Sequence, residues 1–141
     1  MKDVFSENET QIKASEISEI VKNGSLMLLF GDLGSGKTTF IKYLALSLGF
    51  KEYEIKSPTF TYIRKATMED KNFYHIDLYR INGADEMLMR EIEEIIENPK
   101  NIVAIEWADK LSNISLPKKH IKISFQYISP ELRKIEIENN S

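Results

Sequence analysis

A glycine-rich stretch dictates the local structure of the first third of the chain. Gly31, Gly36, Lys37 and Thr38 match the pattern G-x-x-x-x-G-K-[ST]. In this pattern the glycines let backbone N–H groups close around phosphate oxygens, the lysine reaches the β- and γ-phosphates, and the hydroxyl binds Mg²⁺. The apolar run before Gly31 predicts a buried strand, and the apolar spacing of residues 39–48 predicts a helix. The chain therefore has the strand, loop and helix that a phosphate loop requires, with the phosphates at the positive end of the helix.

The composition limits the chain to a few classes of protein. With 141 residues and 42% hydrophobic content, residues 1–141 are expected to form a single phosphate-loop domain. The chain has no cysteine, which excludes disulfides and thiolate metal sites. We expect a cytoplasmic protein without a membrane segment, because the sequence lacks a signal-peptide core and a run of membrane-spanning length. The formal charge of −3 argues against a broad nucleic-acid surface, so any RNA would be contacted at most indirectly, through a partner.

A capping box at residues 6–9 predicts the start of the first helix. We expect this helix to run to Lys22 and to stop at Gly24. Its periodicity indicates a helix packed on the edge of a sheet. The buried face is predicted to contain Thr10, Ala14, Ile17 and Val21, with Ile20 beside it.

The segment Ser57-Pro58-Thr59 predicts a loop that enters a strand, because proline disfavours the helical conformation of the residue before it. In phosphate-loop proteins a threonine at this point can approach Mg²⁺ and the γ-phosphate, as in the switch segment of GTPases. Thr59 is the candidate for that role. The alternative is ordinary strand propensity, since threonine is common in strands. Residues 66–71 are interpreted as a polar turn.

Two later apolar segments each end near a carboxylate. Residues 72–79 predict a strand with Asp77 near its end, and residues 101–105 predict a strand covered on both faces, followed directly by Glu106. Such strand ends are where phosphate-loop folds place groups that hold Mg²⁺ or orient the attacking water. The apolar run before Glu106 is the cleaner one, so we assign Mg²⁺ binding to Glu106. Asp77 is then the candidate for one of two roles: it orients the attacking water, or it stabilises the metal site without binding the metal directly.

Two residues with aromatic rings, His75 and Trp107, lie near these acids in the sequence. His75 is interpreted as a hydrogen-bonded core residue, because a lone histidine without cysteine partners rarely marks a metal site. Trp107, the only tryptophan, is either a core anchor or a lid on the site.

The remaining segments complete the expected fold. The pattern from residue 84 or 85 to residue 96 predicts a helix whose glutamates form a solvated face. Strict alternation over residues 120–127 and 132–137, around a Ser-Pro turn, predicts an antiparallel hairpin, with residues 138–141 as a frayed tail. Together the elements predict an α/β, P-loop NTPase-like fold of three layers, with a mostly parallel sheet and a C-terminal antiparallel hairpin.

Four motifs, taken in order, resemble those of the bacterial TsaE (YjeE) family, the small ATPase of tRNA threonylcarbamoyladenosine biosynthesis. They are Gly31–Phe40, Ser57–Thr61, His75–Arg80 and Ile105–Trp107. The likeness covers nearly the whole chain, and an ordered set of four motifs is more specific than the phosphate loop alone.

The resemblance implies a role for each candidate residue. It implies that ATP hydrolysis needs Asp77, with Lys37 and Thr59 in the same catalytic set, and that Mg²⁺ is held by Thr38 and Glu106. It also implies an adenine pocket between the first helix and the C-terminal hairpin. The residues that it assigns to nucleotide binding are Gly34, Ser35, Gly36, Lys37, Thr38, Thr39, Thr10 and Arg133.

The resemblance further implies an ATPase that does not itself modify tRNA. Such proteins bind the paired TsaB and TsaD proteins, of which TsaD transfers the threonylcarbamoyl group to the adenosine beside the anticodon. No arginine can be assigned to the γ-phosphate from the sequence, because the sequence does not fix where Arg64, Arg80 and Arg90 lie in the fold. We therefore expect weak intrinsic hydrolysis that a partner stimulates.

Three positions depart from the common family pattern. Ser35 replaces an alanine, Ala108 a proline, and Met89-Arg90 a Leu-Gly pair, which leaves the ATP site intact and affects surface and partner contacts. Two alternatives to the family function stay open at this point: a small-molecule kinase, and a nucleotide-sensing switch that acts by conformation alone. The sequence contains no N-K-x-D guanine-specificity motif.

Overall fold

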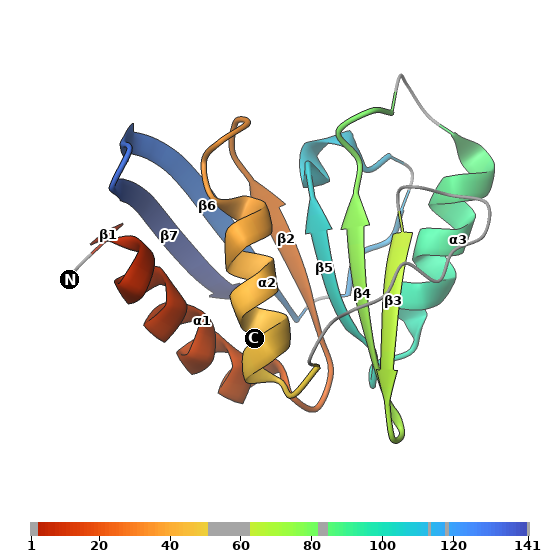
Figure 1. The fold of residues 1–141 in the computed structure, drawn as a ribbon. Helices are drawn as coiled ribbons and strands as arrows, with labels where there is room; N and C mark the ends of the chain where they lie inside the picture. Colours follow the sequence, from red (N-terminus) through yellow and green to blue (C-terminus); the bar gives the residue numbers. More distant parts are fainter. Residues whose placement is uncertain (1–2, 51–62, 82–84, 113, 118, 141) are drawn as a thin grey trace.

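A computed structural model describes residues 3–50, 63–81, 85–112, 114–117 and 119–140. These residues form a seven-stranded sheet in the order β1-β7-β6-β2-β5-β4-β3 (Figure 1). The strands are β1 (Val4–Phe5), β2 (Ser25–Phe30), β3 (Ile63–Met68), β4 (Lys71–Asp77), β5 (Ile102–Glu106), β6 (His120–Ser129) and β7 (Leu132–Asn140).

The four central strands run parallel, and the pairs at both edges are antiparallel. Strand β2 lies between β6 and β5, and β5 pairs in parallel with β4. Every residue of β5 is buried, as are residues 26–29 of β2, which explains the unbroken apolar runs in the sequence. The antiparallel β6–β7 hairpin follows as predicted. The fold class expected from the sequence is therefore confirmed.

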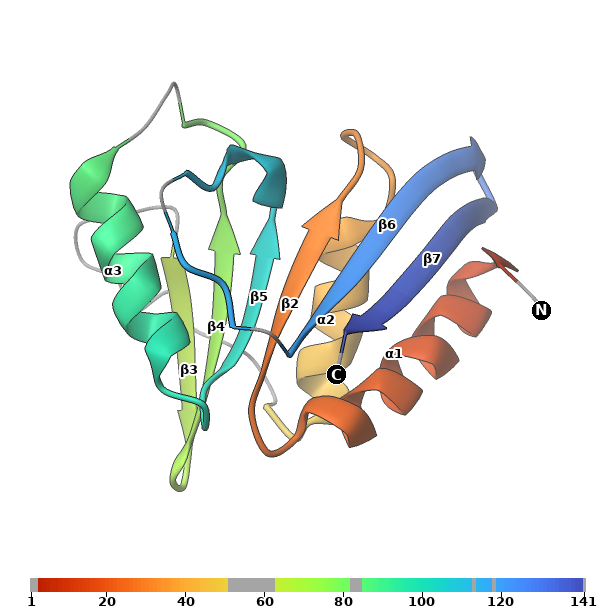
Figure 2. The same ribbon diagram turned by 180° about the vertical axis from the view of Figure 1, so that it is seen from behind.

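Helices cover both faces of the sheet and give the molecule three layers. Helices α1 (Glu7–Val21) and α2 (Lys37–Ser47) pack on one face, and α3 (Glu86–Glu97) packs on the other (Figures 1 and 2). The predicted capping box starts α1, because the Glu9 N–H donates to Ser6 Oγ at 3.2 Å and the Ser6 N–H donates to Glu9 Oε1 at 3.0 Å. Asp85 caps α3 by accepting from the Leu88 N–H at 3.0 Å.

Alternation along the strands separates two cores. Met27, Phe73 and Ala104 face α1 and α2, while Leu28 and Ile105 belong to the core beneath α3. The same alternation turns the side chains two residues after Phe73 and two after Ala104 toward α2. The chemistry-bearing residues at the carboxyl ends of β4 and β5 are therefore directed to the side of the sheet where α2 begins.

Several boundaries differ from those expected. Helix α1 ends at Val21 with Lys22 as its C-cap, and Ile20 is 55% exposed rather than packed beside the apolar face. Residues 66–71 are not a turn, because β3 continues to Met68 and β4 begins at Lys71. The two strands pair through this region, so only the two residues between them make the turn.

The C-terminal end is also more ordered than its polar composition predicts. Residues 138–140 are not frayed, because they continue β7 and pair with β6, His120 opposite Asn140. Strand β1 was not expected; it pairs with β7 through Val4 and Lys134. Ser57 and Thr59 lie outside the described residues. No helix in the described part of the chain combines the length and apolar character needed to cross a bilayer.

Candidate functional site

The loop that joins β2 to α2 lies at the carboxyl end of the central strands. Gly36 is the N-cap of α2, with φ 105°, and no side chain caps the helix start. Gly31 has φ 141°, and a Cβ added there would lie 2.6 Å from the Phe125 carbonyl oxygen, so only glycine fits. Uncapped N–H groups at a helix start favour an anion. The glycines thus shape a loop that can surround a phosphate.

Lys37 is held inside this loop. It is 4% exposed, and its ammonium donates to the carbonyl oxygens of Gly31 and Asp32, the latter at 3.0 Å. Burial lowers the pKa of Lys37, although the carboxylates of Glu106 and Asp77 act in the opposite direction. A buried ammonium beside an uncapped helix start favours an anionic ligand.

Thr38 and Glu106 meet at the centre of the site. Thr38 Oγ1 lies 2.9 Å from Glu106 Oε1 and 3.1 Å from Oε2, although the two residues are 68 positions apart in the sequence. The Glu106 carboxylate is 3% exposed, and His75 Nε2 lies 2.5 Å from its Oε2. The structure therefore places a hydroxyl and a carboxylate side by side at the start of α2.

The carboxyl group of Glu106 is kept ionised by its neighbours. Its burial raises the pKa, but the hydrogen bond and charge of His75, the Thr38 hydroxyl and the Lys37 ammonium together outweigh burial. The net effect is a pKa below the ordinary carboxyl value of 4.5. The group is thus an anionic oxygen donor at neutral pH.

Asp77 and Trp107 line a hollow at this end of the sheet, the first of two. Its volume is about 290 Å³, and its lining includes both of these residues, Thr38 and Glu106. Asp77 Oδ1 accepts from the Tyr79 N–H at 3.0 Å, and the Tyr79 ring lies 5.1 Å from that of Trp107. Trp107 is partly buried and packs against the core beneath α3, so it serves as an anchor and also lies over the site.

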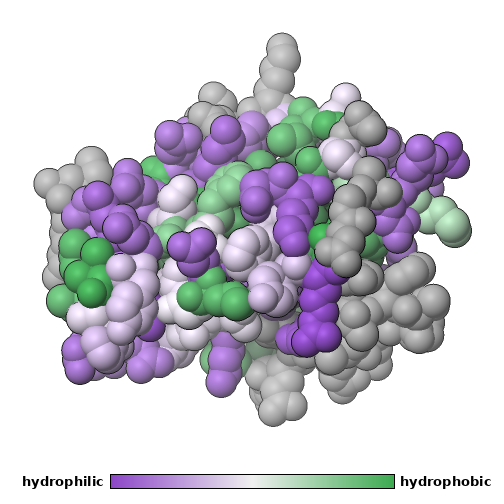
Figure 3. All heavy atoms as spheres, turned by 90° about the horizontal axis from the view of Figure 1, so that it is seen from above, coloured by the Kyte–Doolittle hydropathy of each residue, from purple (hydrophilic) through white to green (hydrophobic). Residues whose placement is uncertain are grey.

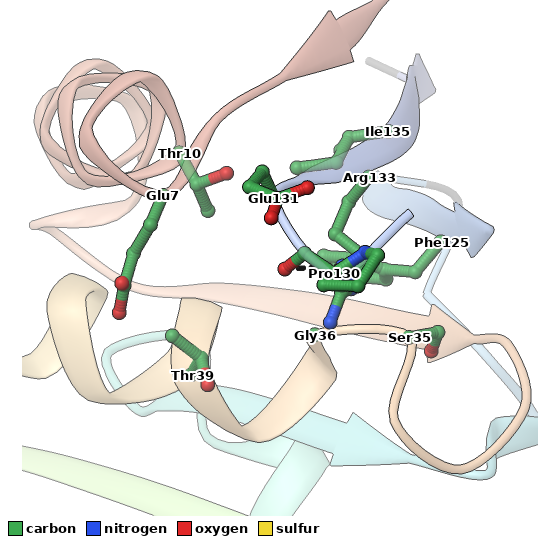
Figure 4. Close-up of a pocket in the computed structure, with 10 residues that line it drawn as sticks. All are labelled: Glu7, Thr10, Ser35, Gly36, Thr39, Phe125, Pro130, Glu131, Arg133 and Ile135. Atoms are coloured by element: carbon green, nitrogen blue, oxygen red, sulfur yellow. Dashed lines mark hydrogen bonds between the residues drawn. The ribbon is translucent and has the colours of Figure 1, made fainter. Parts of the chain in front are cut away.

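A second hollow of about 180 Å³ adjoins the first (Figure 4). It lies between α1 and the β6–β7 hairpin, with Thr10 on one side and Arg133 on the other. The Thr10 hydroxyl donates to the Ser6 carbonyl at 2.8 Å. Both hollows share Ser35, Gly36, Thr39 and Arg133. They are therefore two parts of one continuous surface at this end of the sheet.

Arg133 links the hairpin to the glycine-rich loop. Its Nε–H donates to the Gly34 carbonyl at 3.1 Å, and one terminal nitrogen donates to the Ser129 carbonyl at 2.6 Å. Its guanidinium carbon lies 4.7 Å from the centroid of the Tyr127 ring. Seen from above, the end of the sheet that carries the two hollows has polar and apolar groups interspersed over its surface (Figure 3).

The structure thus brings together most of the residues selected from the sequence. Those that line the first hollow are Gly34, Ser35, Gly36, Lys37, Thr38, Thr39, Asp77, Glu106 and Arg133. Thr10 lines only the second hollow, and Thr59 lies outside the described residues. His75 is a hydrogen-bonded core residue as expected, but its bond to Glu106 was missed. The signal available in the sequence was its position two residues before Asp77 on the same strand face.

The donor set around Glu106 fits Mg²⁺. Mg²⁺ takes oxygen ligands and is commonly held by one or two protein oxygens together with phosphates and water. Thr38 and Glu106 supply one hydroxyl and one carboxylate side by side. No group of three or more histidine, aspartate or glutamate side chains suited to a metal occurs among the described residues. A metal bound here would complete its coordination with phosphate oxygens or water.

Comparison with known proteins relates the whole arrangement to one family. A family model described as threonylcarbamoyl adenosine biosynthesis protein TsaE matches residues 4–135. The tRNA threonylcarbamoyladenosine biosynthesis protein TsaE of Nostoc sp. is 39% identical over 124 residues, covering 86% of this chain and 74% of the relative. The protein of the same name from Treponema pallidum is 31% identical, covering 94% of this chain and 95% of the relative.

The fold has a solved counterpart as well. The crystal structure of YdiB from Bacillus subtilis aligns with a TM-score of 0.72 and 28% sequence identity, covering 97% of this chain and 82% of that chain. Sequence match, fold and the order of the motifs therefore agree. This chain belongs to the TsaE family of tRNA threonylcarbamoyladenosine biosynthesis proteins.

Proposed function

We propose that this protein is a Mg²⁺-dependent ATPase that supports threonylcarbamoyl modification of the tRNA adenosine next to the anticodon by acting on the TsaB–TsaD complex. The observation that carries the proposal is the contact of Thr38 with Glu106, at 2.9 Å, beside the buried ammonium of Lys37. A hydroxyl, a carboxylate and an ammonium around a glycine-rich loop are the groups that phosphoryl transfer from a nucleotide requires.

Each residue has a defined part in the proposed reaction. Lys37 and the backbone N–H groups of the loop bind the phosphates, and Thr38 with Glu106 holds Mg²⁺. When bound, Mg²⁺ neutralises phosphate charge. Asp77, which lines the same hollow, orients the attacking water. The chemistry is thus positioning and charge neutralisation, with water as the acceptor.

The second hollow fits the base of the nucleotide in this proposal. It adjoins the loop through Gly36 and Thr39, so a nucleotide whose phosphates lie in the loop can extend into it. Thr10 and Arg133 border it from opposite elements, one from α1 and one from the hairpin. The adenine therefore lies between α1 and the hairpin, with Thr10 and Arg133 as its neighbours.

We propose that hydrolysis by the isolated protein is weak. Of the arginines in the described residues, Arg133 is the one that lines the first hollow. Its guanidinium already donates to the carbonyls of Gly34 and Ser129, so two of its N–H donors are engaged within the protein. Without an arginine to stabilise the charge of the transition state, hydrolysis is slow, and TsaB and TsaD are expected to stimulate it.

Phosphate release from ATP tests the proposal. Wild type, Lys37→Ala and Glu106→Ala are each assayed in Mg²⁺, with and without TsaB and TsaD. Lys42→Ala is the matched control, because Lys42 lies exposed on the same helix. We expect turnover that rises with the partners, is retained by Lys42→Ala and is lost in the two site variants.

Other outcomes identify other functions. A wild type that binds ATP but releases no phosphate, with or without partners, would be a nucleotide-sensing switch. Transfer of the phosphate to a small molecule rather than to water would make the protein a kinase. Full turnover by the isolated protein, with no rise when TsaB and TsaD are added, contradicts the partner-stimulated mechanism.

A further inference from the structure

His75 lies directly behind the carboxylate that faces Thr38. It belongs to β4, is 2% exposed, and its Nε2 lies 2.5 Å from Glu106 Oε2. The strand register pairs His75 with Ala104, two residues before Glu106. Two residues of a strand span about 6.6 Å, so His75 and Glu106 lie diagonally across the β4–β5 pair. The imidazole spans this diagonal.

The direction of this hydrogen bond follows from the chemistry of its two partners. An ionised carboxylate can only accept, so the Nε2 of His75 must carry the proton and donate it. The same carboxylate accepts from the Thr38 hydroxyl at 2.9 and 3.1 Å. Glu106 is therefore fixed from two sides, by a donor on the neighbouring strand and by a donor at the start of α2.

We propose that His75 is a positioning residue for the Mg²⁺ site, whose Nε2–H orients the Glu106 carboxylate toward Thr38. The inference rests on the proposed function, because it gives Glu106 the part of a Mg²⁺ ligand. His75 itself touches neither nucleotide nor metal in this account. Hydrogen-bonded neighbours that orient metal ligands typically change metal affinity by about ten- to hundredfold when they are removed.

Two substitutions separate the donor from the bulk of the ring. His75→Phe keeps a planar ring in the core but removes the N–H. His75→Gln places an amide N–H near the position of Nε2 and so retains a donor. His120→Gln is the matched control, because His120 starts β6 at the end of the sheet opposite the glycine-rich loop.

The measured quantity is the effect of Mg²⁺ on nucleotide affinity. The dissociation constant of ADP is determined in EDTA and in Mg²⁺ for each protein, and the ratio of the two constants gives the coupling between metal and nucleotide. We expect the ratio to fall by about tenfold or more in His75→Phe and to return to within about threefold of wild type in His75→Gln. The constant in EDTA should stay near the wild-type value in all three variants.

The outcomes separate this inference from the proposed function. If the ADP affinity of wild type does not depend on Mg²⁺, the Mg²⁺ assignment is wrong, and so is this inference. A strong Mg²⁺ effect that His75→Phe leaves unchanged overturns this inference alone. Equal losses in His75→Phe and His75→Gln, or parallel losses in EDTA, identify His75 as a packing residue only.

A measurement on wild type keeps the test decisive if His75→Phe does not fold. Long-range ¹H–¹⁵N NMR spectra identify which ring nitrogen of His75 carries the proton. A protonated Nε2 is expected from the contact with Glu106 Oε2. An Nε2 without a proton cannot donate to Glu106 and overturns the proposal.

Discussion

The ammonium of Lys37 lies 4.4 Å from the centroid of the Trp107 ring. Trp107 follows Glu106 directly and has a left-handed backbone, with φ 57° and ψ 45°. Such a conformation is strained for a bulky residue and tends to occur at functional sites. Here it turns the chain away from the strand direction and places the indole beside the lysine of the glycine-rich loop. The position of Lys37 is thereby linked to the only tryptophan of the protein.

Trp107 emission should therefore report nucleotide binding. If a phosphate group draws the Lys37 ammonium toward it, the contact with the ring changes, and so does the emission of the single tryptophan. We expect a change that saturates at one ADP per chain. Adenosine, which has no phosphate, should not reproduce it at the same occupancy. An identical response to adenosine and ADP would contradict the link through Lys37.

The Thr38 hydroxyl should be needed for Mg²⁺-dependent turnover. Thr38→Val keeps the shape of the side chain but removes the oxygen that lies 2.9 Å from Glu106. We expect partner-stimulated phosphate release to fall by about hundredfold, which corresponds to roughly 2.7 kcal/mol of activation free energy. Thr38→Ser restores a hydroxyl and should stay within about tenfold of wild type. Equal activities of the valine and serine variants would exclude a role for this oxygen.

Local patterns predicted the site better than they predicted its surroundings. The glycine-rich loop is specified by adjacent residues, and the long apolar run before Glu106 identifies a buried strand end, so Lys37, Thr38 and Glu106 could be selected from the sequence alone. The capping box that starts α1 is equally local.

Contacts between distant segments could not be predicted in this way. Arg133 donates to Gly34 across 99 positions, and this contact depends on how the hairpin lies over the loop. The partner of His75 depends on the register between β4 and β5, which periodicity leaves open. Strand β1 has only two residues, too few for a periodic signal, and it forms because β7 offers an edge.

The ionised Glu106 should make stability depend on acid pH. Its folded-state pKa lies below the ordinary value of 4.5, so the native state binds the proton more weakly than the unfolded chain. The resulting stabilisation is fully present above pH 4.5 and is lost as pH falls through the lower, folded-state pKa. Urea unfolding of wild type and Glu106→Gln at a series of pH values measures this contribution.

The pH dependence of the free energy of unfolding should differ between the two proteins below that pH and not above it. At acid pH the slope of the free energy of unfolding should be shallower in Glu106→Gln, by at most about 1.4 kcal/mol per pH unit, because one titrating proton is removed. Identical slopes would mean that the carboxyl group is not stabilised in its ionised form.

Arg133 should support nucleotide affinity through its planar shape and not only through its charge. Its Nε–H donates to Gly34, and its guanidinium stacks on Tyr127. Lysine cannot make both contacts, so Arg133→Lys should weaken ADP binding by about tenfold, and Arg133→Ala, which also removes the charge, should weaken it further. Tyr127→Phe keeps the ring and should bind like wild type. Isothermal titration calorimetry measures the affinities, and wild-type binding by Arg133→Lys would reduce the role of Arg133 to its charge.

The buried hydroxyl of Ser35 should lower the free energy of unfolding. Its side chain is 1% exposed, and its hydroxyl has no hydrogen-bond partner among the residues that the structure describes. A buried, unpaired hydroxyl costs about 1–3 kcal/mol, so Ser35→Ala should raise the free energy of unfolding by about 1 kcal/mol. The backbone of the loop is unchanged, and ADP affinity should stay within about twofold.

Ser18 provides the matched control for this substitution. It is also buried, at 5% exposed, but its hydroxyl donates to the Ser15 carbonyl at 2.6 Å. Ser18→Ala loses that bond, about 1 kcal/mol, which offsets the roughly 0.5 kcal/mol gained from the better helix propensity of alanine. Urea unfolding should therefore show stabilisation in Ser35→Ala only. A loss of stability in Ser35→Ala would show that the loop hydroxyl is satisfied in solution, for example by water.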